Sequence, residues 1–246
     1  MREIKKIWFF IGFVILSSIT YATYQYWEKG FIANATLDGK AELQKLYANY
    51  LGKDSFTLSG KIYLLDNADD PQAREETVFN FQKEGNRIFS QIGILNTYVT
   101  KDLVVQLDTL NRIILVSDNS PFKNSLLPFD MFMSDTATFK TSVDISGSGD
   151  DQILEIKSEL NPSIQSCKIH YDPSTLEIKS TEIRWAKELS FGNEEKNANG
   201  WITKTKYDGK PAIRINIEEE IYKIIKINKG KVELYPAFLD YQLHVL

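Results

Sequence analysis

The chain of 246 residues contains one cysteine and two histidines, and this scarcity removes several kinds of chemistry. A single thiol, Cys167, allows no disulfide within the chain, a composition that suits an oxidising compartment. His170 and His244 lie in separate predicted strands without a further ligand at zinc spacing, so we expect no metal site. Cys167 alternates with Ile169 and Tyr171, which predicts a buried side chain of small hydrophobic type.

Reaction motifs are also missing. The sequence has no Gly-x-Ser-x-Gly elbow, no P-loop and no dinucleotide fingerprint. The glycine-rich stretch Ser146–Asp151 carries two carboxylates but lacks the spaced oxygen ligands of a calcium loop, so it predicts a hairpin turn. Glu218–Glu220 lies between two strand-like patterns and predicts a solvated turn. Without a cluster of titratable residues, we expect the protein not to be an enzyme and to need no cofactor.

Strong net charge is absent as well. The 29 basic and 33 acidic residues give a formal net charge of -4. No broad positive surface is expected to replace the counterions of a phosphate backbone, so nucleic acid is an unsuitable partner. Hydrophobic residues at 43% and charged residues at 25% are typical of a globular chain with a real core.

One long uncharged run is present near the N-terminus. Arg2, Lys5 and Lys6 precede Ile7–Trp27, whose 21 residues carry no charge. As a helix this run would cross ~30 Å of hydrocarbon, and the aromatic residues at its far end suit a membrane interface. The preceding positive charges predict a cytoplasmic N-terminus and an exported remainder. A secretory signal cleaved after Ala22 is the alternative, although the aromatic cluster favours a retained anchor.

The whole chain divides into three predicted parts. Residues 1–27 form a signal peptide or transmembrane anchor, 28–39 a linker, and 40–246 one folded domain. Within this domain, Lys40–Leu51 predicts a helix because its apolar residues recur at helical spacing, with Asp38 as the expected N-terminal cap.

Alternation of apolar and polar residues predicts antiparallel strands over most of the remaining chain. Ser55–Ser117 indicates a meander of about five strands, in which Arg87–Leu95 forms one strand. Pro121–Asp135 interrupts this pattern with bulky apolar residues, and later strands include Pro211–Glu218 and Ile221–Ile227. The expected fold class is therefore mainly β (α+β), a curved antiparallel sheet or incomplete β-barrel lidded by short helices.

Four stretches carry a family resemblance. They are a helix, short link and strand (Ala41–Leu65), a hairpin (Phe79–Gly93), and two strand pairs (Val104–Ser117 and Ile169–Ile183). Their order resembles the LolA/LolB-like family of periplasmic lipoprotein and lipid carriers. Members of that family have an unclosed barrel lidded by helices, with an apolar cavity that receives acyl chains.

The resemblance implies a binding site made of apolar side chains. They would line or lid the cavity, and they are Leu43, Leu46, Phe56, Leu58, Ile62, Leu64, Phe79 and Phe81. The implied function is a cell-envelope module, free or tethered in the periplasm, that binds lipid or lipoprotein acyl chains. The alternative is a single-pass inner-membrane assembly subunit of an envelope or secretion complex, with envelope proteins as partners and no ligand.

Overall fold

The computed structural model describes residues 37–66, 72–118, 141–159, 164–186, 200–209, 214–228 and 231–246. The N-terminal run Ile7–Trp27 and the apolar segment Pro121–Asp135 lie outside the described residues. Within the described ranges, no helix is both long enough and apolar enough to cross a membrane.

The described part is mainly β, as predicted. Two α-helices, α2 (Leu37–Leu51) and α4 (Ile217–Ile224), and the 3-10 helix η1 (Pro236–Phe238) accompany the strands. The strands are β1 Ser55–Leu65, β2 Glu75–Glu84, β3 Arg87–Ile92, β4 Leu95–Val99, β5 Leu103–Asp108, β6 Ile113–Asp118, β7 Thr141–Ser148, β8 Asp151–Ser158, β9 Ile164–Asp172, β10 Glu177–Trp185, β11 Ile202–Tyr207, β12 Ile225–Asn228, β13 Lys231–Leu234 and β14 Gln242–Val245.

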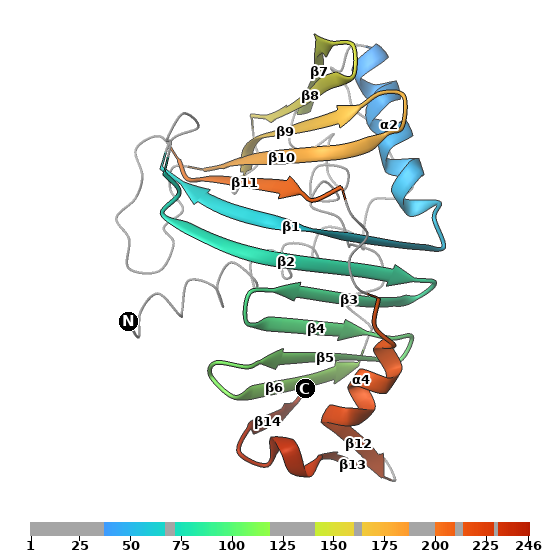
Figure 1. Ribbon diagram of the computed structural model, residues 1–246, viewed down its shortest axis with the longest axis vertical. Helices are drawn as coiled ribbons and strands as arrows, with labels where there is room; N and C mark the ends of the chain where they lie inside the picture. Colours follow the sequence, from blue (N-terminus) through green and yellow to red (C-terminus); the bar gives the residue numbers. More distant parts are fainter. Residues whose placement is uncertain are drawn as a thin grey trace. The chain divides into compact units, whose positions relative to one another are not determined.

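Twelve of these strands form one hydrogen-bonded sheet in the order β14-β6-β5-β4-β3-β2-β1-β11-β10-β9-β8-β7 (Figure 1). β12 and β13 pair separately. The sheet is open, because β14 and β7 are its two ends among the described strands. The expectation of a purely antiparallel sheet is wrong at one end, where β14 runs parallel to β6.

The chain folds into two compact units, which we describe separately. Unit 1 consists of residues 1–53, 60–77 and 124–209, and its described elements are α2, most of β1, the start of β2, and β7–β11. Unit 2 consists of residues 54–59, 78–123 and 210–246. Its described elements are the start of β1, most of β2, β3–β6, α4, η1 and β12–β14.

Helix α2 begins at Leu37, three residues before the predicted start. Asp38 therefore lies inside the helix, and its prediction as the N-terminal cap is wrong. Gly39 marks a close approach in unit 1, since a Cβ added there would lie 2.5 Å from the backbone oxygen of Val143 in β7. The helix ends where the Gly52 N–H donates to the Ala48 carbonyl at 2.9 Å.

The first meander has six strands rather than about five. Arg87–Leu95 is not one strand, because Gly93 adopts a φ of 57° and turns the chain between β3 and β4. Its N–H donates to the Val78 carbonyl at 2.9 Å. Gly85, also with a φ of 57°, forms the predicted hairpin turn between β2 and β3. Both turns require the left-handed backbone that glycine adopts without steric cost.

The largest error of the sequence prediction concerns the region after residue 210. The sequence pattern predicts strands at Pro211–Glu218 and Ile221–Ile227, with Glu218–Glu220 as a solvated turn between them. Instead Ile217–Ile224 is helix α4, which includes those glutamates in its first turn, and the strand β12 begins at Ile225.

Local chemistry explains why α4 is helical. The Asn216 side chain accepts a hydrogen bond from the Glu219 N–H, which caps the helix at its N-terminus. The three glutamates of the first turn and Lys223 in the last turn complement the helix dipole. The buried residues recur at helical spacing on one side of the helix; they are Ile217, Ile221 and Ile224.

Candidate functional site

One face of the sheet in unit 1 is apolar. Register places six buried side chains in a single row across β7, β8, β9, β10, β11 and β1. Helix α2 lies against this face, because an added Cβ at Gly39 would also meet the Val143 side chain. The row confirms that Cys167 is buried. Its members are Val143, Ile156, Cys167, Ile183, Thr203 and Leu64.

The opposite face of the same unit is charged. The next row across these strands carries acidic and basic residues. Lys157 and Lys168 approach Glu155 at 3.0 and 3.9 Å, and all three side chains are at least partly exposed. Unit 1 is therefore apolar on one face and charged over β7–β10 on the other, where Ile202 and Leu65 are nevertheless buried on β11 and β1. The charged row is Asp144, Glu155, Lys168, Glu182 and Lys204.

Two of the predicted site residues, Leu43 and Leu46, lie on α2 and are each 1% exposed. The helix is fastened nearby, where the Tyr50 hydroxyl accepts the Ile178 N–H at 3.1 Å and the Asn49 amide donates to the Leu176 carbonyl at 3.2 Å. Burial raises the pKa of Tyr50, and the hydrogen bond from Ile178 acts in the opposite direction.

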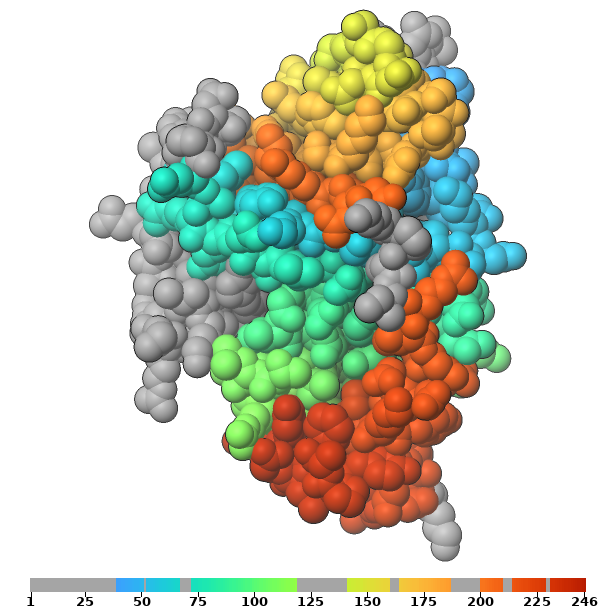
Figure 2. All heavy atoms as spheres, in the orientation of Figure 1, coloured from blue at the N-terminus to red at the C-terminus, as the bar shows by residue number. Residues whose placement is uncertain are grey.

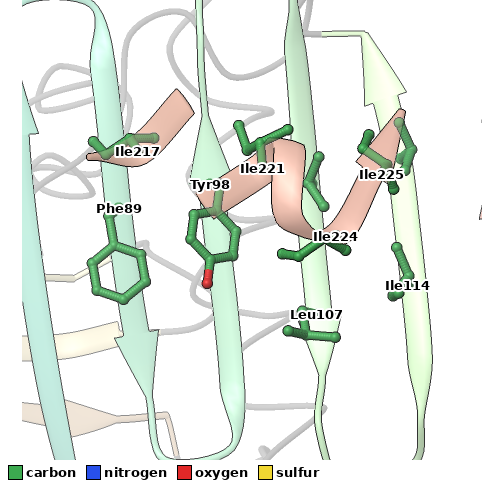
Figure 3. Close-up of a cluster of buried hydrophobic side chains, with 10 residues drawn as sticks. Phe89, Tyr98, Leu107, Ile114, Ile217, Ile221, Ile224 and Ile225 are labelled. Atoms are coloured by element: carbon green, nitrogen blue, oxygen red, sulfur yellow. The ribbon is translucent and has the colours of Figure 1, made fainter. Parts of the chain in front are cut away.

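Unit 2 has one face covered by α4, which we call the α4 face. Phe89, Tyr98, Val105 and Val116 form a row across β3, β4, β5 and β6. The isoleucines of α4 and the first residue of β12 pack on this row and its neighbours (Figure 3). Those isoleucines are Ile217, Ile221, Ile224 and Ile225.

A buried tyrosine lies beneath α4. The rings of Phe89 and Tyr98 are 5.2 Å apart between centroids, and Tyr98 is 5% exposed. Burial raises the pKa of Tyr98 to about 12; the negative charge of Glu220 adds to this shift, and Lys223 opposes it. The phenol therefore remains neutral over the physiological pH range.

The other face of unit 2 is what we call the phenylalanine face, defined by Phe56, Leu58, Phe79 and Phe81. Gln82 on β2 pairs with Phe89 and therefore points to the α4 face. Phe79 and Phe81 occupy the alternate positions of β2, so both point to the opposite face. The rings of Phe56 and Phe81 stack, with centroids 5.5 Å apart and planes inclined by 30°.

A second apolar row lies on the phenylalanine face beside these rings. Register aligns Ile88, Val99 and Val104, which are buried. Next to this apolar row, a polar row in register with Phe81 consists of Ser90 on β3, Thr97 on β4 and Gln106 on β5. Unit 2 therefore has buried apolar residues on both faces, and a polar row crosses the phenylalanine face.

The eight predicted site residues fall into two groups. Leu43, Leu46, Ile62 and Leu64 belong to unit 1, and the four residues of the phenylalanine face belong to unit 2. Five are buried: Leu43, Leu46, Phe56, Leu64 and Phe79; the half-buried ones are Leu58, Ile62 and Phe81. Their contact with a ligand stays a prediction.

Three further buried apolar residues of the phenylalanine face escaped the sequence prediction. They are Ile88, Val99 and Val104, and each occupies an alternating position that could have revealed it. The predicted strand Arg87–Leu95 runs through the turn at Gly93. This error obscures which residues before and after the turn share a face of the sheet.

The remaining motifs are structural. Ser146–Asp151 forms the β7–β8 hairpin, as predicted, with Gly147 at a φ of 97° and Gly149 at 64°. Among the residues that the structure describes, no group of three or more His, Cys, Asp or Glu side chains could hold a metal ion.

Comparisons with known proteins give weak likenesses. No family model matches the chain. No curated protein sequence matches it either. One solved structure with a weak overall likeness is an uncharacterized conserved protein from Thermus thermophilus, with 10% identity over 83% of this chain and 99% of that one and a TM-score of 0.45.

Two other solved structures are similar over somewhat less of the chain. A DUF1329 family protein from Desulfovibrio piger is 10% identical over 74% of this chain and 96% of its own, with a TM-score of 0.35. The Mycobacterium tuberculosis lipoprotein LppX is 9% identical over 72% of this chain and 96% of its own, with a TM-score of 0.33.

Proposed function

We propose that this protein is a cell-envelope module that binds lipid or lipoprotein acyl chains on the phenylalanine face. The observation that supports this proposal is the pair of stacked aromatic rings on this face. Leu58 and Phe81 are only half-buried there and keep apolar surface that an acyl chain would cover, whereas α4 packs on the opposite face of unit 2. An acyl chain is a suitable second layer for the stacked rings of Phe56 and Phe81.

The expected affinity follows from the burial of methylenes. Each buried methylene contributes about 0.8 kcal/mol, so ten of them contribute about 8 kcal/mol before the cost of association. That cost is at least about 4 kcal/mol. The remainder of at most about 4 kcal/mol corresponds to a dissociation constant of about 1 mM or weaker for ten methylenes. Each further buried methylene should tighten binding about fourfold, so titrations should extend into the millimolar range.

Binding, not catalysis, is the proposed role, and its proposed place is the periplasm. The uncharged run Ile7–Trp27 supports export and tethering to the inner membrane with a cytoplasmic N-terminus. A tethered module would present its acyl-binding face to envelope lipids or lipoproteins without diffusing between membranes.

A fluorescent fatty acid titrated against the full chain tests this function. The double variant Phe79→Asp, Phe81→Asp should lose binding by at least about tenfold, because each carboxylate would have to be desolvated beneath the acyl chain. Val78→Asp is the matched control, since Val78 is 52% exposed on the same strand and on the opposite side. It should bind like the parent protein.

A milder variant separates loss of binding from loss of folding. Phe81 is half-buried, so Phe81→Ala should keep a cooperative thermal transition while weakening the fatty acid several-fold. The proposal is wrong if the parent protein never binds the probe and its organic extract contains no lipid. It is also wrong if the Val78 and phenylalanine variants bind equally well while folded.

The alternative function, a single-pass assembly subunit without a ligand, is favoured by the same N-terminal run. It predicts stable co-isolation with other envelope proteins after mild detergent extraction, and no effect of the phenylalanine substitutions on that association. A chain that purifies as a clean species without envelope partners contradicts this alternative.

A further inference from the structure

Strand β14 forms one end of the sheet in unit 2, beside β6 (Figure 1). The Gln242 N–H donates to the Arg112 carbonyl at 2.8 Å, and the Leu246 N–H donates to the Val116 carbonyl at 2.9 Å. In a parallel pair, alternate residues direct their backbone groups to the neighbour. The N–H and C=O groups of Leu243 and Val245 therefore point away from β6.

The outer edge of β14 carries none of the charge or proline that usually protects an edge strand. Gln242–Leu246 contains no acidic, lysine or arginine side chain and no proline, and Val245 is 59% exposed. No strand in the described part of the chain pairs with this edge. In Figure 2 the red C-terminal residues lie at the surface, next to light green residues of the same unit.

The opposite end of the sheet differs. β7 carries Asp144, and near its end Gly147 takes a φ of 97° with a close backbone approach to Asp151. A charge and an irregular, glycine-containing end both discourage the addition of another strand. Of the two ends of the described twelve-stranded sheet, the β14 end is therefore the one suited to pairing.

We propose that two copies of this chain pair through β14, antiparallel about a two-fold axis at His244. In this register Leu243 of one copy faces Val245 of the second copy, and the reverse. Each of these two pairs exchanges two backbone hydrogen bonds, which gives four bonds in total. These bonds are formed by the backbone N–H and C=O groups of Leu243 and Val245, which point away from β6.

Self-complementarity favours a second copy over another extended chain. A two-fold axis at His244 brings each outward backbone group opposite its partner without any shift of register. Residues 242–246 include no acidic, lysine or arginine side chain, so pairing brings no like charges of such side chains together. Because the β7 end is protected, pairing at β14 closes a dimer and does not propagate into a fibre.

A cysteine at the axis tests the register directly. Residues that face each other without exchanging hydrogen bonds lie about 4.5 Å apart at Cα in an antiparallel pair, within the range that a disulfide spans. In the full chain, in its membranes and under mild oxidation, His244→Cys should yield a disulfide-linked dimer. The native Cys167 is buried and does not compete.

Two variants make the test specific. Tyr222 belongs to the same unit and is 62% exposed, so Tyr222→Cys places an accessible thiol outside β14. This variant should give little disulfide-linked dimer. Val245→Pro removes an outward N–H and leaves the hydrogen bonds to β6 in place. Combined with His244→Cys, it should reduce the linked dimer by at least about tenfold, since two of four interchain bonds are lost.

Three results would overturn the proposal: no linked dimer with His244→Cys, equal linking with Tyr222→Cys, or no effect of Val245→Pro. A thermal transition like that of the parent protein confirms that the proline variant is folded. An interchain product with a different protein, identified by its mass, would also contradict pairing between copies. None of these readouts depends on lipid binding.

Discussion

The side chain of Gln82 holds the backbone of Ile215 with two hydrogen bonds. Its amide nitrogen donates to the Ile215 carbonyl at 2.8 Å, and its amide oxygen accepts the Ile215 N–H at 2.9 Å. Gln82 lies on β2 and is 4% exposed, and Ile215 comes two residues before α4. This bidentate contact fixes where the α4 segment joins the α4 face of unit 2.

Replacing this glutamine should loosen α4. Gln82→Met keeps the side-chain volume but leaves two backbone groups of Ile215 without partners, which should cost about 2–4 kcal/mol of unfolding free energy. Urea denaturation measures the change. Asn80→Ala is the control on the same strand, because Asn80 is partly exposed and bonds the Gln91 side chain at 2.8 Å. Equal losses in the two variants would contradict this account.

The apolar face of unit 1 contains a buried hydrogen bond. The Trp185 indole donates to the Thr203 hydroxyl at 2.7 Å, and both side chains are buried. Thr203→Val should therefore lower the unfolding free energy by about 1–3 kcal/mol. Thr205→Val, two residues along the same strand and face, should cost less, since no side-chain hydrogen bond of Thr205 is found among the described residues. A larger loss from Thr205→Val would refute the prediction.

Stability should fall at high pH because of Tyr98. Its pKa is about 12 in the folded protein and 10.0 ordinarily, so the folded state favours the neutral phenol. The stabilisation is complete below pH 10 and disappears as the pH rises through 12. Tyr98→Phe should therefore flatten part of the decline in unfolding free energy between these values, as measured by denaturation at each pH.

Spectroscopy provides a second readout of the same phenol. Phenolate absorbance should also show one late-titrating group fewer in the Tyr98 variant. An identical alkaline decline in the parent and the Tyr98 variant would show that the buried phenol is not responsible.

The intact mass of the mature protein tests the proposed tether. A retained anchor predicts a membrane-bound chain whose mass includes residues 1–27. A soluble chain that starts after Ala22 would instead identify a cleaved signal and favour a freely diffusing carrier. Removing the positive charges of Arg2, Lys5 and Lys6 should reduce correct membrane orientation, as measured by protease protection.

Local sequence determined much of the sheet. Alternation placed Phe79 and Phe81 on one face of β2, and the Glu84–Asn86 turn located the first hairpin, since both depend on neighbouring residues alone. Helix α2 was predicted from its apolar spacing to within three residues. These features need no information about distant parts of the chain.

Region 211–227 shows where local reasoning was insufficient. Its isoleucines suit a strand by β-branching, yet their spacing also suits a helix, and Asn216 with the glutamates after it supplied a cap that could have been recognised. The helix gains from burial on Phe89 and Tyr98 and from the hold of Gln82 on Ile215. Those contacts join residues more than a hundred positions apart.

Most strands, most turns and the sets of side chains that share a face follow from the amino-acid order alone, because a period of two residues is a local property of the chain. That α4 covers the face opposite Phe79 and Phe81, and that β14 runs parallel to β6, emerges from the folded chain and not from local patterns. Both outcomes depend on which distant surfaces exclude water together, and no short stretch of sequence contains that information.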